Sequence, residues 1–162
     1  NNTLIFRMES EIPPVVPIHL KIEINCKEHF NVLPMQKIPF SVSNKWYKGG
    51  CDVLTYQLDE LVGTKLRALY QRRKGRDLYD LYKALTTKEL NIVNVLKCYN
   101  LYMDFVVDHI PTYKEFIINM EDKMQDEEFL GDTKQLLRPD EHFNPQEGYE
   151  VVKTALIDRL QK

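Results

Sequence analysis

The sequence predicts an α+β fold in which a small mixed sheet, formed by residues 1–56, precedes a helical bundle lobe formed by residues 57–162. The prediction depends on one change in the periodicity of the apolar residues. Before residue 57 they alternate in short runs, as in strands with one buried face, and after it they recur every three or four residues, as in amphipathic helices. Strands followed by helices are typical of the α+β class.

The clearest strand covers residues 18–25, because Ile18, Leu20, Ile22 and Ile24 fall on one face by the two-residue period. Residues 4–8 are expected to form its partner strand, after a proline-containing connection. Shorter strands are expected at residues 39–42 and 53–56, on either side of a turn at Gly49-Gly50.

The first helix is expected over residues 57–73, with an apolar stripe made of Leu58, Leu61, Val62, Leu66 and Leu69. Gly75 is expected to end it by adopting a left-handed conformation, and a second helix is expected to begin near Arg76. Proline and glycine then separate further predicted helices at residues 88–107, 112–124, 132–137 and 146–160.

The composition excludes several classes of protein. The chain has 162 residues, of which 43% are hydrophobic and 28% charged, as in ordinary globular proteins. No segment approaches the roughly 20 apolar residues of a membrane span, so no membrane partner is expected. A formal charge of −2 argues against wrapping duplex nucleic acid, so any nucleic-acid contact is expected to be local. Three cysteines without C-x-x-C spacing predict reduced thiols and a cytoplasmic protein.

Lys65 interrupts the apolar stripe of the first helix, four residues after Leu61 and four before Leu69. Burying an ammonium group without a partner is costly. Either the side chain extends along the helix to reach water, or it meets an anion at a cleft of the protein.

Cations and carboxylates are concentrated just after this helix, where Arg73, Lys74 and Arg76 precede Asp77 and Asp80. The two aspartates are three residues apart and therefore share a helix face. Together with Lys65 they form a candidate catalytic set, and the three cations are candidate phosphate-binding residues. The alternative is structural: Asp77 caps the second helix, Asp80 pairs with Arg76 or Lys83, and the basic run is solvated surface.

Glu23 is a candidate metal ligand on the polar face of the predicted strand 18–25. A carboxylate that projects into a cleft from a strand is a suitable ligand for Mg²⁺. The alternative is an ion pair with Lys21 or Lys27.

The segments KIEINCKEHF and YQLDELVGTKLRALYQRRKGRDLYDLY resemble those of the AbiEii/AbiGii-type nucleotidyltransferase toxins of bacterial abortive-infection toxin–antitoxin pairs. The resemblance is most specific over residues 18–85. It implies the C-terminal part of a nucleotidyltransferase fold, an NTP substrate such as GTP, Mg²⁺, a cognate antitoxin, and tRNA or another RNA as one acceptor. It also implies that Lys65 contacts phosphate, that Asp77 or Asp80 is catalytic, and that Glu23 takes the place of a third carboxylate.

Two features of that family have no counterpart in this sequence, namely the Gly-Ser or Gly-Gly-Thr turn and the Asp-x-Asp pair. Because the chain starts without Met, we expect a preceding portion to carry them in the parent enzyme. The 162-residue chain alone is then expected to be inactive. The alternative function is a non-catalytic interaction module that binds RNA or an antitoxin through the surface of residues 67–76.

Overall fold

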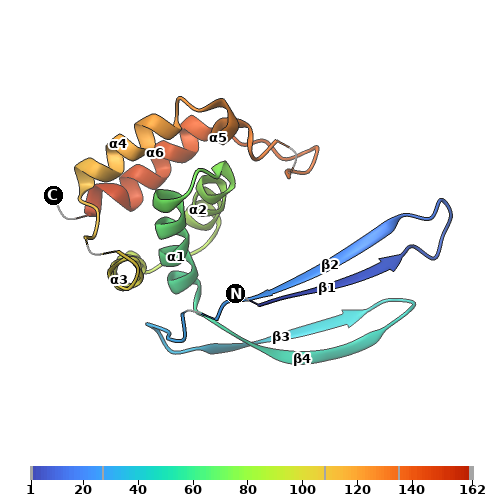
Figure 1. Cartoon of the computed structure of the whole chain (residues 1–162). Helices are drawn as coiled ribbons and strands as arrows, with labels where there is room; N and C mark the ends of the chain where they lie inside the picture. Colours follow the sequence, from blue (N-terminus) through green and yellow to red (C-terminus); the bar gives the residue numbers. More distant parts are fainter. Residues whose placement is uncertain (1, 27, 108, 135, 161–162) are drawn as a thin grey trace. The chain divides into compact units, whose positions relative to one another are not determined.

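The computed structural model describes residues 2–26, 28–107, 109–134 and 136–160, with all strands before all helices (Figure 1). The α+β prediction is confirmed. In chain order the elements are β1 (Asn2–Glu9), β2 (Pro17–Ile24), β3 (Gln36–Ser43), β4 (Lys48–Thr55), α1 (Leu58–Gln71), α2 (Gly75–Thr87), α3 (Ile92–Asp104), α4 (Tyr113–Lys123), α5 (Glu127–Gly131), α6 (Pro145–Ala155) and the 3₁₀ turn η1 (Ile157–Arg159).

The chain divides into two compact units, residues 1–31 and 32–162. The first unit is the antiparallel hairpin β1–β2, in register from Asn2 opposite Ile24 to Glu9 opposite Pro17. Both strands were predicted. Apart from Asn2 at its end, one face of the hairpin is apolar. The apolar side chains of this face, which are 42% to 51% exposed, are Leu4, Phe6, Met8, Ile18, Leu20, Ile22 and Ile24.

The second unit begins with the antiparallel hairpin β3–β4, so the strands form two separate two-stranded sheets. The turn predicted at Gly49-Gly50 is wrong, because both glycines lie within β4. The chain turns instead at Asn44, whose side-chain oxygen accepts the backbone N–H groups of Trp46 and Tyr47 at 2.9 Å each. Gly50 is required for another reason, since an added Cβ would lie 2.8 Å from the carbonyl oxygen of Phe40.

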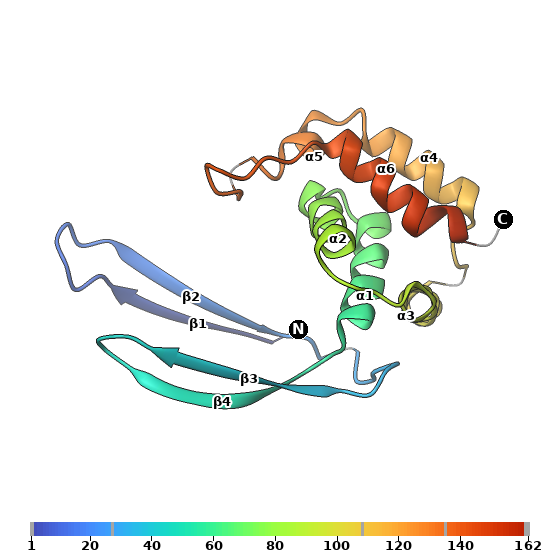
Figure 2. The same cartoon turned by 180° about the vertical axis from the view of Figure 1, so that it is seen from behind.

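The helices of the second unit enclose one apolar core, and both views show α4 and α6 side by side (Figures 1 and 2). Leu66 and Leu69 of the predicted stripe are fully buried, whereas Leu58 and Leu61 are 36% and 42% exposed. Burial of each large apolar side chain stabilises the fold by about 1.5–3 kcal/mol. The core residues are Val62, Leu66, Leu69, Leu78, Leu81, Val95, Tyr99, Met103, Phe116, Met120, Phe129, Val152, Leu156, Ile157 and Leu160.

Local hydrogen bonding determines where the later helices begin. Asn91 caps α3, Thr112 forms a capping box with Glu115 at the start of α4, and Asn144 caps α6. The helix predicted at residues 132–137 is wrong, because Asp126 caps a shorter helix, α5, that ends at Gly131. None of the described helices combines the length and the hydrophobicity needed to cross a bilayer. The predicted domain division after residue 56 coincides with the change from β4 to α1 and otherwise stays a prediction.

Candidate functional site

The structure brings the three predicted catalytic residues together at the junction of α1 and α2. Lys65 projects from α1, and its Nζ lies 3.2 Å from Oδ1 of Asp77 and 2.8 Å from Oδ2 of Asp80, both on α2. The helices are joined by only residues 72–74, which keeps the lysine beside the aspartates. We call Lys65, Arg72, Asp77 and Asp80 the α1–α2 charge cluster.

Arg72 is the member of this cluster that the sequence analysis did not single out. Its Nε donates to Oδ2 of Asp77 at 2.6 Å, and its Nη2 donates to Oδ1 at 2.7 Å. The Asp77 side chain is fully buried, and each of its two carboxylate oxygens contacts a cation. Asp77 is therefore not a cap of α2, which begins without any side-chain cap.

The charges of the cluster stabilise one another. Burial opposes the negative charge on Asp77, but the hydrogen bond from Arg72 and the nearby charges of Lys65 and Arg72 outweigh it and lower the pKa of Asp77. Burial likewise opposes the charge on Lys65, but the hydrogen bond and charge of Asp80, with those of Asp77, raise the pKa of Lys65. Both groups are ionised at neutral pH.

The members of the cluster differ in whether a ligand can reach their side chains. The Asp77 side chain has no exposed surface, whereas those of Lys65, Asp80 and Arg72 are exposed by 31%, 47% and 52%. A ligand therefore reaches Lys65, Asp80 and Arg72. Asp77 can act only by holding the two cations in place.

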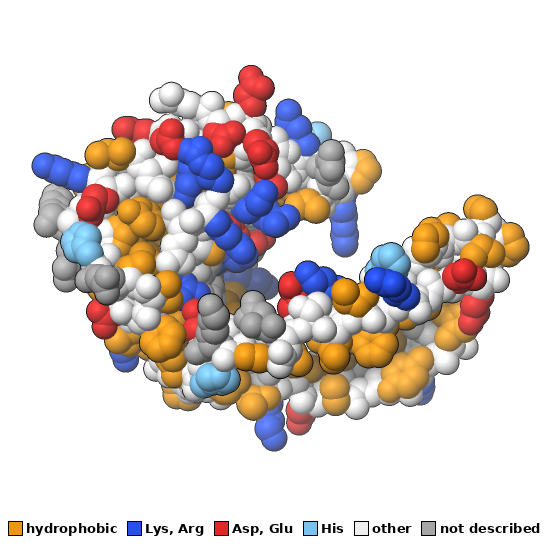
Figure 3. Space-filling view, in the orientation of Figure 1, with side chains coloured by type: hydrophobic (Ala, Val, Ile, Leu, Met, Phe, Trp, Pro, Cys, Tyr) orange, Lys and Arg blue, Asp and Glu red, His pale blue; other side chains and the backbone are white. Residues whose placement is uncertain are grey.

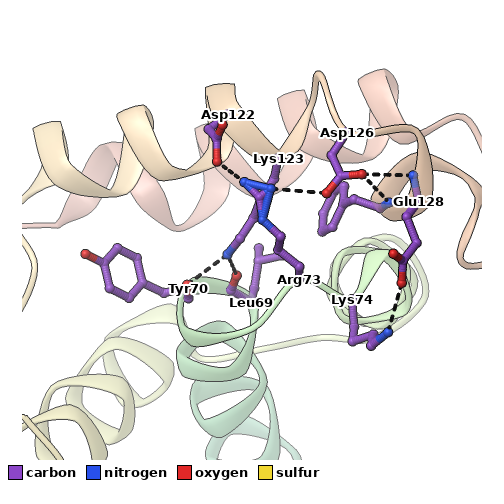
Figure 4. Close-up of polar contacts among 9 residues, drawn as sticks. Leu69, Tyr70, Arg73, Lys74, Asp122, Lys123, Asp126 and Glu128 are labelled. Atoms are coloured by element: carbon purple, nitrogen blue, oxygen red, sulfur yellow. Dashed lines mark hydrogen bonds and ion pairs between the residues drawn. The ribbon is translucent and has the colours of Figure 1, made fainter.

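Two of the predicted phosphate-binding cations, Arg73 and Lys74, face carboxylates of α4, of α5 and of the residue that caps α5 (Figure 4). Arg73 pairs with Asp122 and, at 3.1 Å, with Asp126. Lys74 pairs with Glu128 at 3.5 Å. Basic and acidic side chains accordingly lie next to each other on this face of the helical lobe (Figure 3).

Arg76 differs from these two cations, because its contact with the α5 side is made by the backbone. Its N–H donates to Oδ2 of Asp132 at 3.0 Å, and the residue is exposed. Its guanidinium therefore lies where an anion from solution can meet it.

Comparison with known families identifies the chain. The model of the nucleotidyl transferase AbiEii toxin family, of type IV toxin–antitoxin systems, matches residues 1–155. The chain belongs to the AbiEii toxin family. Searches of curated proteins and of solved structures found no match. The family match confirms the resemblance seen in residues 18–85 and extends it over the C-terminal helices, and it implies a cognate antitoxin as partner.

In this AbiEii chain a second lysine replaces an apolar residue in a helix stripe. Lys123 follows Phe116 and Met120 on α4 and is only 3% exposed. Its Nζ donates to the carbonyl oxygen of Leu69 and, at 2.8 Å, to that of Tyr70, both in the last turn of α1 (Figure 4). These are carbonyls that the helix itself leaves unpaired. Lys123 thus fixes the end of α1 from which Arg72 extends.

Burial, with the charge of Arg73 adding to it, lowers the pKa of Lys123 to about 8 from 10.5. At a pH between these two pKa values, Lys123 is mostly neutral in the folded protein and mostly protonated in the unfolded chain. The folded protein therefore binds fewer protons there, and the free energy of unfolding rises with pH. We expect wild type to gain about 1–3 kcal/mol over the Lys123→Met variant between pH 7.5 and pH 10. Urea denaturation at both pH values measures this. Lys97→Met, at an exposed position, should show no such gain; a similar gain there would contradict the assignment.

Glu23 of the AbiEii chain lies in the first unit, where it forms the ion pair with Lys21 that the sequence left open, at 2.8 Å. Lys27, the other possible partner, lies outside the described residues. No group of three or more His, Cys, Asp or Glu side chains suited to a metal ion occurs in the described part of the chain. Because Asp77 and Asp80 face Lys65, and Glu23 faces Lys21, these carboxylates do not fit a Mg²⁺ site.

Proposed function

We propose that this AbiEii toxin transfers a nucleotide from an NTP, GTP being one candidate, to an RNA or protein acceptor, and that Lys65 contacts the triphosphate. The supporting observation is that Lys65 is accessible while its charge is held by a buried carboxylate, Asp77. An ammonium group fixed in this way is suited to neutralise a phosphate oxygen.

The accessible members of the cluster divide the remaining roles. The acceptor oxygen attacks the α-phosphorus of the NTP, the bond between the α-phosphorus and its bridging oxygen breaks, and pyrophosphate leaves. We propose that the exposed carboxylate of Asp80, next to Lys65, takes up the proton that the acceptor hydroxyl loses. Arg72 and Lys65 are held in place by Asp77, which we propose as a positioning residue. Mg²⁺ is proposed only as the ion that accompanies the NTP, and no step is assigned to it.

The three cations of residues 73–76 are proposed to extend the phosphate site. Arg76 is the strongest candidate among them, because the residue is exposed and its contact with Asp132 uses the backbone, which leaves the guanidinium for a phosphate. Arg73 and Lys74 are already paired with carboxylates, so a phosphate would have to displace Asp122, Asp126 or Glu128.

The test is the Lys65→Ala variant of the toxin expressed from its intact gene. We expect loss of growth arrest and a fall in nucleotide transfer of about 100-fold or more, because one charge contact to the reacting phosphate is removed. Growth curves and incorporation of labelled NTP measure the two effects. Lys97→Ala removes an exposed lysine from α3 and should leave both unchanged. Full activity in Lys65→Ala would reject the proposal.

The second candidate is a non-catalytic module that binds RNA or the antitoxin through the basic surface of residues 67–76. The observation in its favour is that Arg72 and Arg73 keep about half of their side-chain surface exposed, 52% and 45%. It predicts RNA binding that weakens with salt, without affinity for NTP. Titration of the protein with labelled RNA and with GTP separates the two functions.

A further inference from the structure

The connection between α5 and α6 forms a hollow of about 450 Å³ on the helical lobe. Three basic side chains, Lys134, Arg138 and His142, line it together with apolar groups that include Leu130 and Phe143. Basic and apolar side chains lie together at this part of the lobe (Figure 3). The volume lies within the range of about 300–1,000 Å³ that is usual for sites of small organic ligands.

Phe143, which forms the apolar floor of the hollow, packs against α2 and α6. The ring of Phe143 lies edge-on to Tyr79 at 5.2 Å between centroids and 5.4 Å from the ring of Tyr82. Gly148 of α6 makes room for it, since an added Cβ would lie 2.6 Å from the Phe143 ring. These contacts hold the ring of Phe143 in place where it lines the hollow.

Glu141, the carboxylate among the described lining residues, is already neutralised by α2. It pairs with Lys83 and accepts a hydrogen bond of 2.6 Å from the hydroxyl of Tyr79. The contact with Lys83, followed by that with Tyr79, lowers the pKa of Glu141. The positive charges of Lys134 and Arg138 thus dominate the rim and favour an anion.

The hollow and the α1–α2 charge cluster are connected through α2. Asp80 contacts Lys65 in the cluster, and Lys83, three residues further along the same helix, contacts Glu141 in the hollow. Three residues correspond to about 4.5 Å along a helix axis. The hollow and the cluster therefore contact α2 at positions that are about one helical turn apart.

We propose that this hollow binds one nucleotide of a single-stranded RNA, with the phosphate between Lys134 and Arg138 and the base on the floor at Phe143. Combined cations and an aromatic surface are the chemistry that holds single strands without reading their sequence. That the bound strand is also the acceptor rests on the proposed transferase function. Binding itself does not.

The measurement is the affinity of the intact protein for a fluorescent single-stranded RNA of ten nucleotides, followed by anisotropy. We expect the double variant Lys134→Ala/Arg138→Ala to bind this RNA about tenfold or more weakly than wild type. The salt dependence of binding should also fall, by about 0.7 in the logarithmic slope for each phosphate that the variant no longer neutralises. The matched control, Lys97→Ala/Lys114→Ala, removes the same charge from exposed positions on α3 and α4 and should bind as wild type.

Two outcomes would overturn the proposal. One is an equal decrease of affinity in both double variants, which would show that only net charge matters. The other is unchanged RNA affinity together with a decrease of GTP affinity in Lys134→Ala/Arg138→Ala, which would assign the hollow to the free nucleotide. The Lys65→Ala variant separates this inference from the proposed function, because it should lose transfer and keep its RNA affinity. Melting temperatures of all variants verify that each is folded.

Discussion

Replacing Asp77 with asparagine is expected to destabilise the helical lobe by about 3 kcal/mol and to abolish toxicity. The substitution keeps the size of the side chain but removes the charge that holds Lys65 and Arg72. It also places an NH₂ group among donors, so at least one buried contact becomes repulsive. Urea denaturation measures the loss of stability, and growth arrest measures the loss of function.

Asp80→Asn is the matched control, because it removes a carboxylate from the same lysine at a position that is 47% exposed. An exposed ion pair contributes only about 0–1 kcal/mol, so this variant should remain as stable as wild type within that range. Loss of transfer in a stable Asp80→Asn protein would support a chemical role for Asp80. Equal stability of the two variants would contradict the burial and double pairing described for Asp77.

The sequence was sufficient to predict the α1–α2 charge cluster in outline. Lys65 stood out because it occupies a stripe position where an apolar side chain is expected, and Asp77 and Asp80 because their spacing places them on one face of a helix. Both signals are local, since a helix determines which side chains are neighbours over four residues. The same local logic predicted the strands at residues 4–8 and 18–25.

Contacts between distant parts of the chain could not be predicted in this way. Glu60 is the clearest case, since its fully buried carboxylate accepts the N–H groups of Val32 and Leu33 and the hydroxyl of Tyr102, at 2.8 Å each. In the sequence it is an ordinary acidic residue in the first turn of a helix. Its role depends on a loop and a helix that lie 27 to 42 residues away.

Lys123 was missed for a different reason. It interrupts an apolar stripe just as Lys65 does, so the signal was present in the sequence. What the stripe cannot show is the partner: Lys123 meets backbone carbonyls of α1, whereas Lys65 meets carboxylates of α2. An interrupted stripe therefore predicts a buried contact for the lysine without distinguishing a structural bond from a binding site.

For Gly75, the sequence analysis predicted a requirement for glycine but gave the wrong reason for it. The prediction assigned it a left-handed conformation, but no described glycine has a positive φ, and Gly75 is the first residue of α2. Glycine is needed there because a Cβ would lie 2.0 Å from the carbonyl oxygen of Phe129. The close approach lets α5 pack against the turn that carries Arg73 and Lys74.

The Gly75→Ala variant is accordingly expected to be destabilised by about 2–4 kcal/mol, because backbone rather than a flexible side chain must move to relieve the overlap. The turn would shift with it, so growth arrest should weaken together with the melting temperature. Gly131→Ala is the control: it is also a helical glycine, but an added Cβ would have no neighbour within 4 Å. That change should be neutral or stabilise by up to about 1 kcal/mol, since alanine favours helix. Equal melting temperatures for the two variants would show that the Phe129 carbonyl does not approach Gly75 this closely in solution.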